Sequence, residues 1–186
     1  INKTNHRFEF IDLGGGMGIP YDNNKKLNYN KYNNAIKKFL KNKNSKIIFE
    51  PGRSIIGNTG ILIAKIIYIK KSEQKSFVII DAGMNDLIRP ALYGADHKII
   101  PSIKINNSSK KTYEIVGPIC ESTDKFKTLK KFQSLKEKDL IVICDVGAYG
   151  MSLSSNYNLR PKAIELLIKG SKIKIIRARQ KYKEII

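Results

Sequence analysis

The most constraining feature of the sequence is the order of elements in its first 54 residues: a strand, a glycine-rich turn, a helix and a second strand. The apolar segment FEFIDL, residues 8–13, stops at three successive glycines. In residues 28–42, apolar side chains recur at helical spacing and predict an amphipathic helix. The segment KIIFEPGRS, residues 46–54, predicts a second buried strand ended by a Pro-Gly pair. This order predicts a right-handed βαβ crossover, whose sheet or barrel needs partner strands outside this chain.

After residue 54 the pattern changes to short segments rich in Ile and Val, separated by Gly, Asn, Ser and Lys. Most lack a long helical period between them, which predicts a mostly antiparallel β-domain. We expect the boundary near residues 57–60, and short helices near residues 86–93 and 162–167. The strand-like segments are residues 60–71, 75–83, 97–105, 111–120, 139–150 and 172–179.

The formal net charge of +19 raises the question of a nucleic-acid partner. Of the 35 basic residues, 29 are lysines, and they are scattered along the chain. Nucleic-acid sites usually need arginines for bidentate contacts and aromatic rings for stacking. Lys, Asn and Ile are also the residues that AT-rich codons favour, so genomic drift on solvated faces explains the excess better. We expect no nucleic-acid partner, while weak attraction of anionic metabolites stays open.

The remaining composition indicates a reduced, cytoplasmic protein without a metal site. Cys120 and Cys144 do not form a disulfide framework, and neither has a Cys or His at metal-ligand spacing. Cys144 lies in an apolar strand-like segment and is expected in the core. No apolar run is long enough for a membrane span, and the N-terminus lacks the layout of a signal peptide. The chain begins with Ile1 rather than Met, which suggests a fragment.

Five motifs, in this order, give the sequence a resemblance to a known family. They are DLGGGMGIPY, FEPGRSIIGNTG, DAGMNDLIRPALYGA, GPICESTD and DVGAYGMSLSSNYNLRP. Together they resemble the diaminopimelate decarboxylases, which belong to the fold-type III pyridoxal-phosphate (PLP) decarboxylases, over residues 8 to about 179. The resemblance implies an α/β plus β fold like that of alanine racemase and ornithine decarboxylase. Residues 1–57 would be the last βα units of a PLP-binding (β/α)8 barrel, and residues 58–186 the antiparallel β-domain.

The resemblance also implies a PLP site. PLP serves as an electron sink in decarboxylation when its pyridine nitrogen stays protonated. Glu50 matches the family carboxylate beside that nitrogen, and Tyr149 matches a hydroxyl on the phosphate and substrate side. The positions that match the phosphate cradle are Gly14, Gly15, Gly16 and Gly52.

The implied substrate is meso-2,6-diaminopimelate, converted to L-lysine and CO2. Its second carboxylate calls for arginine, whose planar group binds carboxylates bidentately. Arg53 and Arg89 are the candidates, and Tyr93 adds a hydroxyl. Glu121 would take the distal ammonium, and Cys120 would be the general acid that returns a proton after CO2 leaves.

The resemblance further implies a homodimer with shared active sites, each taking the Cys120–Glu121 pair from the partner subunit. The family's Schiff-base lysine lies near the start of the barrel, and no lysine here has a matching context. We therefore expect the isolated chain to lack decarboxylase activity. Two alternatives stay open: a decarboxylase of another basic amino acid, such as ornithine or arginine, and a non-catalytic truncated remnant. After ALYGA the family usually has an aromatic residue where this chain has Asp96, and His97 is expected to be structural.

Overall fold

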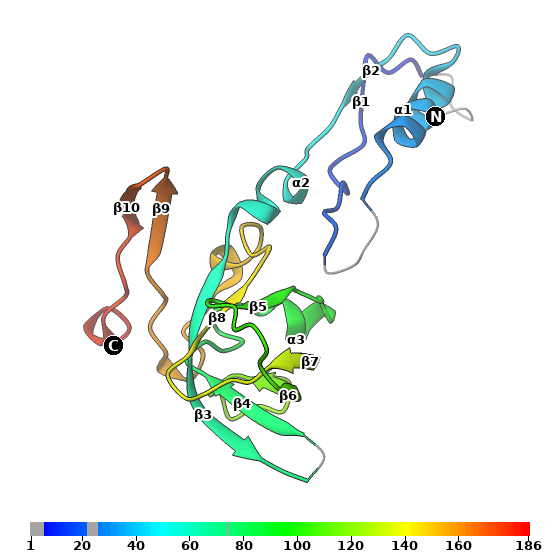
Figure 1. Ribbon diagram of the computed structural model, residues 1–186. Helices are drawn as coiled ribbons and strands as arrows, with labels where there is room; N and C mark the ends of the chain where they lie inside the picture. Colours follow the sequence, from blue (N-terminus) through cyan, green and yellow to red (C-terminus); the bar gives the residue numbers. More distant parts are fainter. Residues whose placement is uncertain (1–5, 22–25, 74) are drawn as a thin grey trace.

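Two short parallel strands and one helix form the first part of the chain (Figure 1). The computed structural model describes residues 6–21, 26–73 and 75–186. Strand β1 (Phe10–Asp12) pairs in parallel with β2 (Lys46–Ile48), and α1 (Tyr29–Leu40) lies between them in sequence. The Asn28 side chain caps α1 by accepting from the backbone N–H of Lys31 at 3.0 Å. The predicted βαβ crossover is therefore confirmed.

This βαβ unit leaves much of its apolar surface exposed. No residue of α1 is buried, although its Tyr32 ring contacts Phe49 at a centroid distance of 6.0 Å. Phe8, Phe10 and Ile48 are exposed on or beside the strands. Within the described residues the sheet has only these two strands. Such a sheet buries too little apolar surface to be stable by itself.

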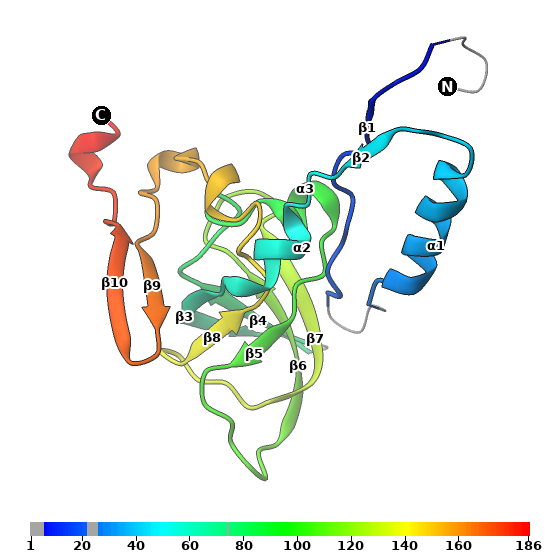
Figure 2. The ribbon, with the colours of Figure 1, turned by 90° about the horizontal axis from the view of Figure 1, so that it is seen from above.

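A six-stranded sheet forms the body of the second part (Figures 1 and 2). Its strand order is β5-β8-β3-β4-β6-β7, and every neighbouring pair is antiparallel except β4 with β6. The predicted, mostly antiparallel β-domain is thus confirmed. The strands are β3 (Leu62–Lys71), β4 (Ser76–Ile80), β5 (Ile99–Pro101), β6 (Lys110–Val116), β7 (Lys125–Gln133) and β8 (Leu140–Ile143).

The core of the sheet follows from the two-residue period of a strand. Alternate residues of four neighbouring strands point to one side and are almost completely buried. They are Ala64 and Ile66 of β3, Val78 and Ile80 of β4, Tyr113 and Ile115 of β6, and Ile141 and Ile143 of β8. The Tyr113 hydroxyl is satisfied in this core, because it accepts from the backbone N–H of Leu135 at 3.0 Å.

Short helices connect the strands and carry several of the motif residues. Two of them, α2 (Arg53–Ile56) and the 3-10 helix η1 (Gly57–Thr59), link the βαβ unit to β3. Helix α3 (Arg89–Tyr93) lies between β4 and β5, where the sequence predicted a short helix. The remaining 3-10 helices are η2 (Met151–Leu153), η3 (Tyr157–Leu159) and η4 (Tyr182–Glu184).

The helix expected at residues 162–167 is wrong. Strand β9 (Glu165–Lys169) occupies most of this segment and pairs with β10 (Lys172–Arg177) in an antiparallel hairpin. The hairpin stands beside the main sheet in both views (Figures 1 and 2). The two apolar strands are joined by a tight turn at Gly170, so pairing with β10 overrides the short helical period of the segment.

Strand β7 was also missed, because its lysines mask the buried residues between them. Phe126, Leu129 and Gln133 are buried, but their spacing does not follow a simple alternation. The register against β6 shifts twice, between Ile115 and Val116 and between Lys111 and Tyr113. Each irregularity changes which face the following side chains occupy, and this removes the signal from the sequence.

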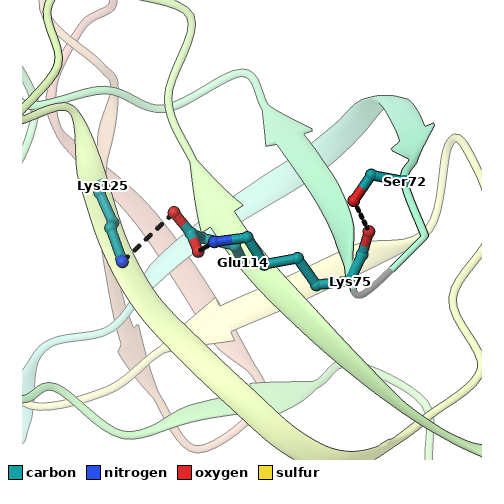
Figure 3. A network of polar contacts seen from close by, with 4 residues as sticks. All are labelled: Ser72, Lys75, Glu114 and Lys125. Atoms are coloured by element: carbon teal, nitrogen blue, oxygen red, sulfur yellow. Dashed lines mark hydrogen bonds and ion pairs between the residues drawn. The ribbon is translucent and has the colours of Figure 1, made fainter.

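A buried carboxylate links three strands of the sheet (Figure 3). Glu114 of β6 is only 8% exposed and contacts the ammonium groups of Lys75, just before β4, and Lys125 of β7. The Lys125 Nζ–Glu114 Oε1 distance is 3.2 Å, and the Lys75 carbonyl accepts from the Ser72 hydroxyl at 2.7 Å. The hydrogen bond from Lys75 is the main cause that lowers the pKa of Glu114 below its ordinary value of 4.5, and Lys125 adds to it.

We expect Glu114→Gln to lower the free energy of unfolding at pH 7 by about 1–3 kcal/mol, because two charge-assisted hydrogen bonds lose their anion. Since the folded pKa is depressed, this stabilisation is present above the ordinary pKa and is lost as the pH falls through the folded pKa. Urea unfolding at pH 7 and pH 3.5 or so would measure both effects. Glu9→Gln is the control, because Glu9 and Lys46 form a largely exposed pair. Equal losses at both pH values would contradict the assignment.

Candidate functional site

A cavity of about 500 Å³ opens between the βαβ unit and the β-domain. Its walls come from the end of the glycine loop, from α2, from α3 with the turn that follows it, and from the loop after β8. Four predicted site residues, Arg53, Arg89, Tyr93 and Tyr149, lie in these walls. The full lining is Tyr21, Arg53, Arg89, Tyr93, Gly94, Ala95, Asp96, Tyr149 and Leu153.

Two guanidinium groups dominate the cavity, and aromatic rings hold them. The Cζ atom of Arg53 lies 5.5 Å from the centre of the Tyr149 ring and 5.9 Å from that of Tyr21. The Cζ atom of Arg89 lies 5.6 Å from the same two rings and 5.8 Å from the Tyr93 ring. Each distance suits a cation–π contact.

Neither guanidinium has a carboxylate partner among the residues that the structure describes. Arg89 is only 4% exposed, and the Nε atoms of both arginines are buried without a hydrogen-bond partner there. Buried charges are costly unless they are paired and hydrogen-bonded. The arrangement therefore favours an anionic ligand, and two planar guanidinium groups suit a carboxylate in particular.

Tyr149 reaches the cavity from a strained loop. Its φ is +59°, a left-handed conformation that is uncommon for a tyrosine. The preceding Gly147 packs against the C-terminal end of α2 so closely that an added Cβ would lie 2.0 Å from the carbonyl oxygen of Ile56. The Tyr149 hydroxyl lies 3.6 Å from the position of a Cβ on Gly52. This packing brings the loop after β8 against the EPGR turn.

The glycine loop provides an open backbone surface beside the EPGR turn. Gly14 and Gly16 have φ of +65° and +76°, and a Cβ on either would meet nothing within 4 Å. Gly15 instead lies against the turn, where an added Cβ would be 2.6 Å from the carbonyl oxygen of Glu50. The backbone N–H of Glu50 donates to the Gly14 carbonyl at 2.9 Å, and the Glu50 side chain is exposed. An open glycine turn of this kind can bind a phosphate group through its N–H groups.

The structure does not bring Cys120 and Glu121 to the cavity of the same chain. Both are exposed in the loop between β6 and β7, outside the cavity lining. The Glu121 carboxylate accepts from the backbone N–H of Thr123 at 3.3 Å and from the Ser122 hydroxyl at 3.2 Å. These hydrogen bonds, that from Thr123 first, lower the pKa of Glu121. The pair is therefore presented to the outside of this chain.

Asp124 holds the loop that carries this pair. Its side chain is buried, with the residue 3% exposed, and accepts from the backbone N–H of Met84 at 2.7 Å and of Ile119 at 2.8 Å. Burial raises the pKa of Asp124, while the two backbone hydrogen bonds oppose that shift. Gly117 lies against the carboxylate, so that an added Cβ would be 2.2 Å from Oδ2. The residue before Cys120 is thus fixed to the loop after β4.

His97 is buried behind the cavity. Its Nδ1 lies 2.9 Å from the Cys144 carbonyl oxygen, which can only accept, so Nδ1 carries the proton. Burial lowers the pKa of His97, and the nearby Arg89 charge adds to this effect. The imidazole is therefore neutral at pH 7. Its position supports the structural role expected from the sequence.

Sequence reasoning assigned no role to five residues of the cavity lining: Tyr21, Gly94, Ala95, Asp96 and Leu153. Tyr21 ends the motif DLGGGMGIPY, yet only its glycines were assigned a role. Asp96 was noticed as a departure from the family pattern, and it forms an ion pair with Lys127 at 2.7 Å. Leu153 lies in η2, directly after the Tyr149 loop. Only Tyr21 carried a usable signal, because a tyrosine directly after a glycine loop is placed to face the same ligand.

Within residues 6–21, 26–73 and 75–186, no group of three or more His, Cys, Asp or Glu side chains could hold a metal ion. No helix in these ranges is both long and apolar enough to span a membrane.

Comparison with known proteins identifies the class. The family model described as pyridoxal-dependent decarboxylase, C-terminal sheet domain, matches residues 12–147. The chain belongs to this family of pyridoxal-dependent decarboxylases. The fold class expected from the sequence, the end of a fold-type III barrel followed by a β-domain, is therefore confirmed.

Within the family, several of the similar proteins and solved structures are named diaminopimelate decarboxylase. The diaminopimelate decarboxylase of Aquifex aeolicus is 41% identical over 187 residues, which cover 100% of this chain and 44% of that protein. The crystal structure of the Helicobacter pylori diaminopimelate decarboxylase with L-lysine is 43% identical with a TM-score of 0.83, covering 95% of this chain and 43% of that one. The M. jannaschii enzyme with L-lysine is 37% identical with a TM-score of 0.85, covering 95% and 42%. The chain thus spans less than half the length of these relatives.

We expect Asp124→Asn to loosen the Cys120 loop without unfolding the sheet. An asparagine keeps the shape but has only one acceptor oxygen, so one backbone N–H would lose its partner and face an amide N–H. A hydrogen bond to a charged group is worth about 1.5–3 kcal/mol. Amide hydrogen exchange at Ile119 and Met84 should therefore accelerate by about tenfold or more.

Glu121→Gln is the matched control for Asp124→Asn. Its carboxylate is exposed and bonds only within its own turn, so exchange at the two amides should not change. Unchanged exchange at both amides in Asp124→Asn would show that the buried carboxylate does not hold the loop.

Proposed function

We propose that this chain is the C-terminal part of a diaminopimelate decarboxylase, which converts meso-2,6-diaminopimelate to L-lysine and CO2. The observation that carries the proposal is the pair of arginines without carboxylate partners in one cavity. A decarboxylase that spares one end of a symmetric diamino dicarboxylic acid must bind the carboxylate that does not react. The names of the relatives, and the L-lysine in the two structures above, agree with this specificity.

The cofactor of the family is pyridoxal 5'-phosphate, and the residues present fit it. The open backbone of Gly14 and Gly16, next to Gly15 and Gly52, would hold the phosphate group, with the Tyr149 hydroxyl at its side. Glu50, exposed beside the same loop, would hold the protonated pyridine nitrogen. When bound, the cofactor supplies an electron sink for the bond that breaks to release CO2.

The residues of this chain then divide the substrate between them. Arg53 and Arg89 bind the carboxylate that is retained, and Tyr93 and Tyr149 line the same cavity. Glu121 binds the ammonium group next to that carboxylate. The Cys120 thiol returns a proton to the carbon that has lost CO2.

We further propose that the active site is completed across a homodimer. Cys120 and Glu121 are exposed and lie outside the cavity lining of their own chain, while Asp124 fixes their loop in a defined position. A two-fold arrangement in which each loop enters the partner's cavity would use this geometry. We place the domain boundary at residues 57–58, within the helical connection to β3, and the protein in the cytoplasm.

The first test is substrate choice in a protein of the relatives' full length that carries these 186 residues, called here the full-length protein. It should decarboxylate meso-diaminopimelate with a kcat/KM at least about 100-fold above that for ornithine or arginine, because only diaminopimelate offers a second carboxylate to the two arginines. Preference for ornithine or arginine would assign the chain to another decarboxylase of the family. An inactive full-length protein would favour the non-catalytic remnant.

The second test addresses the shared site by mixing two inactive subunits. One carries Cys120→Ala, and the other lacks the barrel lysine that anchors the cofactor. In a heterodimer, one of the two sites regains all of its groups, so at random pairing about a quarter of wild-type activity should return. The control is a double variant that carries both changes in one subunit. Mixed with either single variant, it should restore no decarboxylase activity. If mixtures stay inactive although subunit exchange is demonstrated, each site belongs to a single chain.

A further inference from the structure

Tyr21 stands between the two arginines and the buried histidine. The centre of its ring lies 5.9 Å from Arg53 Cζ, 5.6 Å from Arg89 Cζ and 5.1 Å from the His97 ring centre, with an interplanar angle of 73° to the imidazole. One ring thus contacts both guanidinium groups and the group behind them. Arg53 starts α2, whereas Arg89 starts α3, so this ring connects two helices that are far apart in the chain.

The hydroxyl of Tyr21 is buried and has no hydrogen-bond partner among the described residues, although the residue lines the cavity. A buried hydroxyl without a partner costs roughly 1–3 kcal/mol, so such groups usually have one. The two nearby guanidinium groups are donors only. An anion in the cavity is an acceptor that all three groups can share.

The neutral state of His97 limits the positive charges around Tyr21 to the two arginines. Because its Nδ1 proton is used by the Cys144 carbonyl and burial lowers its pKa, it adds no third positive charge behind Tyr21. The charges that face Tyr21 are therefore Arg53 and Arg89, with the Asp96 carboxylate at the cavity edge engaged by Lys127. Tyr21 therefore adds a neutral hydroxyl donor to a cavity wall that also carries two guanidinium groups.

We propose that Tyr21 is a specificity residue: its hydroxyl is the third donor to the carboxylate bound by Arg53 and Arg89, and its ring keeps the two guanidinium groups in place. This inference rests on the proposed function for the identity of the ligand. It also connects the two halves of the site, because Tyr21 ends the segment that begins with the glycine loop. The same segment would contact both the phosphate and the retained carboxylate.

Two variants of the full-length protein separate the two roles of Tyr21. Tyr21→Phe keeps the ring and removes the hydroxyl, whereas Tyr21→Leu removes both. Calorimetry would measure their binding of L-lysine and of 1,5-diaminopentane, which is lysine without its carboxylate. Tyr157→Phe is the matched control, because Tyr157 is exposed and lies outside the cavity lining.

Tyr21→Phe should bind L-lysine about tenfold more weakly, since one hydrogen bond to a charged group is lost. Its affinity for 1,5-diaminopentane should stay within about twofold of wild type. Tyr21→Leu should lose about 100-fold for L-lysine, because the arginines also lose their support. The control should match wild type for both ligands.

Unchanged L-lysine binding in Tyr21→Phe, or an equal loss for both ligands, would overturn the proposal. Because Tyr21→Phe conserves the packed ring and removes a buried hydroxyl that has no partner among the described residues, its thermal unfolding temperature without ligand should equal or exceed that of wild type, and the result does not depend on a misfolded variant. The proposed function is judged separately by wild-type decarboxylation of meso-diaminopimelate. If the wild type decarboxylates meso-diaminopimelate and Tyr21→Phe binds L-lysine normally, the proposed function stands and only the role of Tyr21 is rejected.

Discussion

The site depends on the positive charges of Arg53 and Arg89, which contact the same two tyrosine rings. Neither charge is paired with a carboxylate of the described residues. Arg53 and Arg89 repel each other, and burial of Arg89 removes the solvent that would screen this repulsion. The Tyr21 and Tyr149 rings offset part of this cost through their negative faces. Such a cationic pair costs free energy while no anion is bound, and an anion in the cavity would offset part of that cost.

The sequence predicted the elements whose signal is local. The βαβ crossover followed from a strand, a glycine turn and a helical period, and most strands of the β-domain followed from runs of Ile and Val. The sequence did not predict strand β7, because two register shifts break the alternation of its buried residues. It did not predict strand β9, because pairing with β10 outweighs the short helical period of that segment. In both cases the deciding interaction lies on another segment, which a window of sequence does not contain.

The same distinction holds for the site. Arg53, Arg89, Tyr93 and Tyr149 could be named from motifs, and the structure places all four around one cavity. The sequence could not show that the rings of Tyr21 and Tyr149 hold the guanidinium groups, because these contacts join segments far apart in the chain.

The composition favoured genomic drift on solvated faces as the explanation for the excess of lysine, but some of these lysines have structural partners. Lys75 and Lys125 form ion pairs with Glu114, and Lys127 forms one with Asp96, so part of the positive charge stabilises the fold.

The single parallel pair in the main sheet has a consequence for how the protein folds. Antiparallel neighbours can be joined by a tight turn, but the connection from β4 to β6 must cross over, and it carries α3 and β5 on the way. Strand β5 is then held by β8, and β8 by the start of β3. During synthesis, β5 therefore has no partner strand in the sheet until residues 140–143 are available. Contacts of such sequence separation form slowly, so Arg89 meets Tyr149 only when most of the chain has left the ribosome.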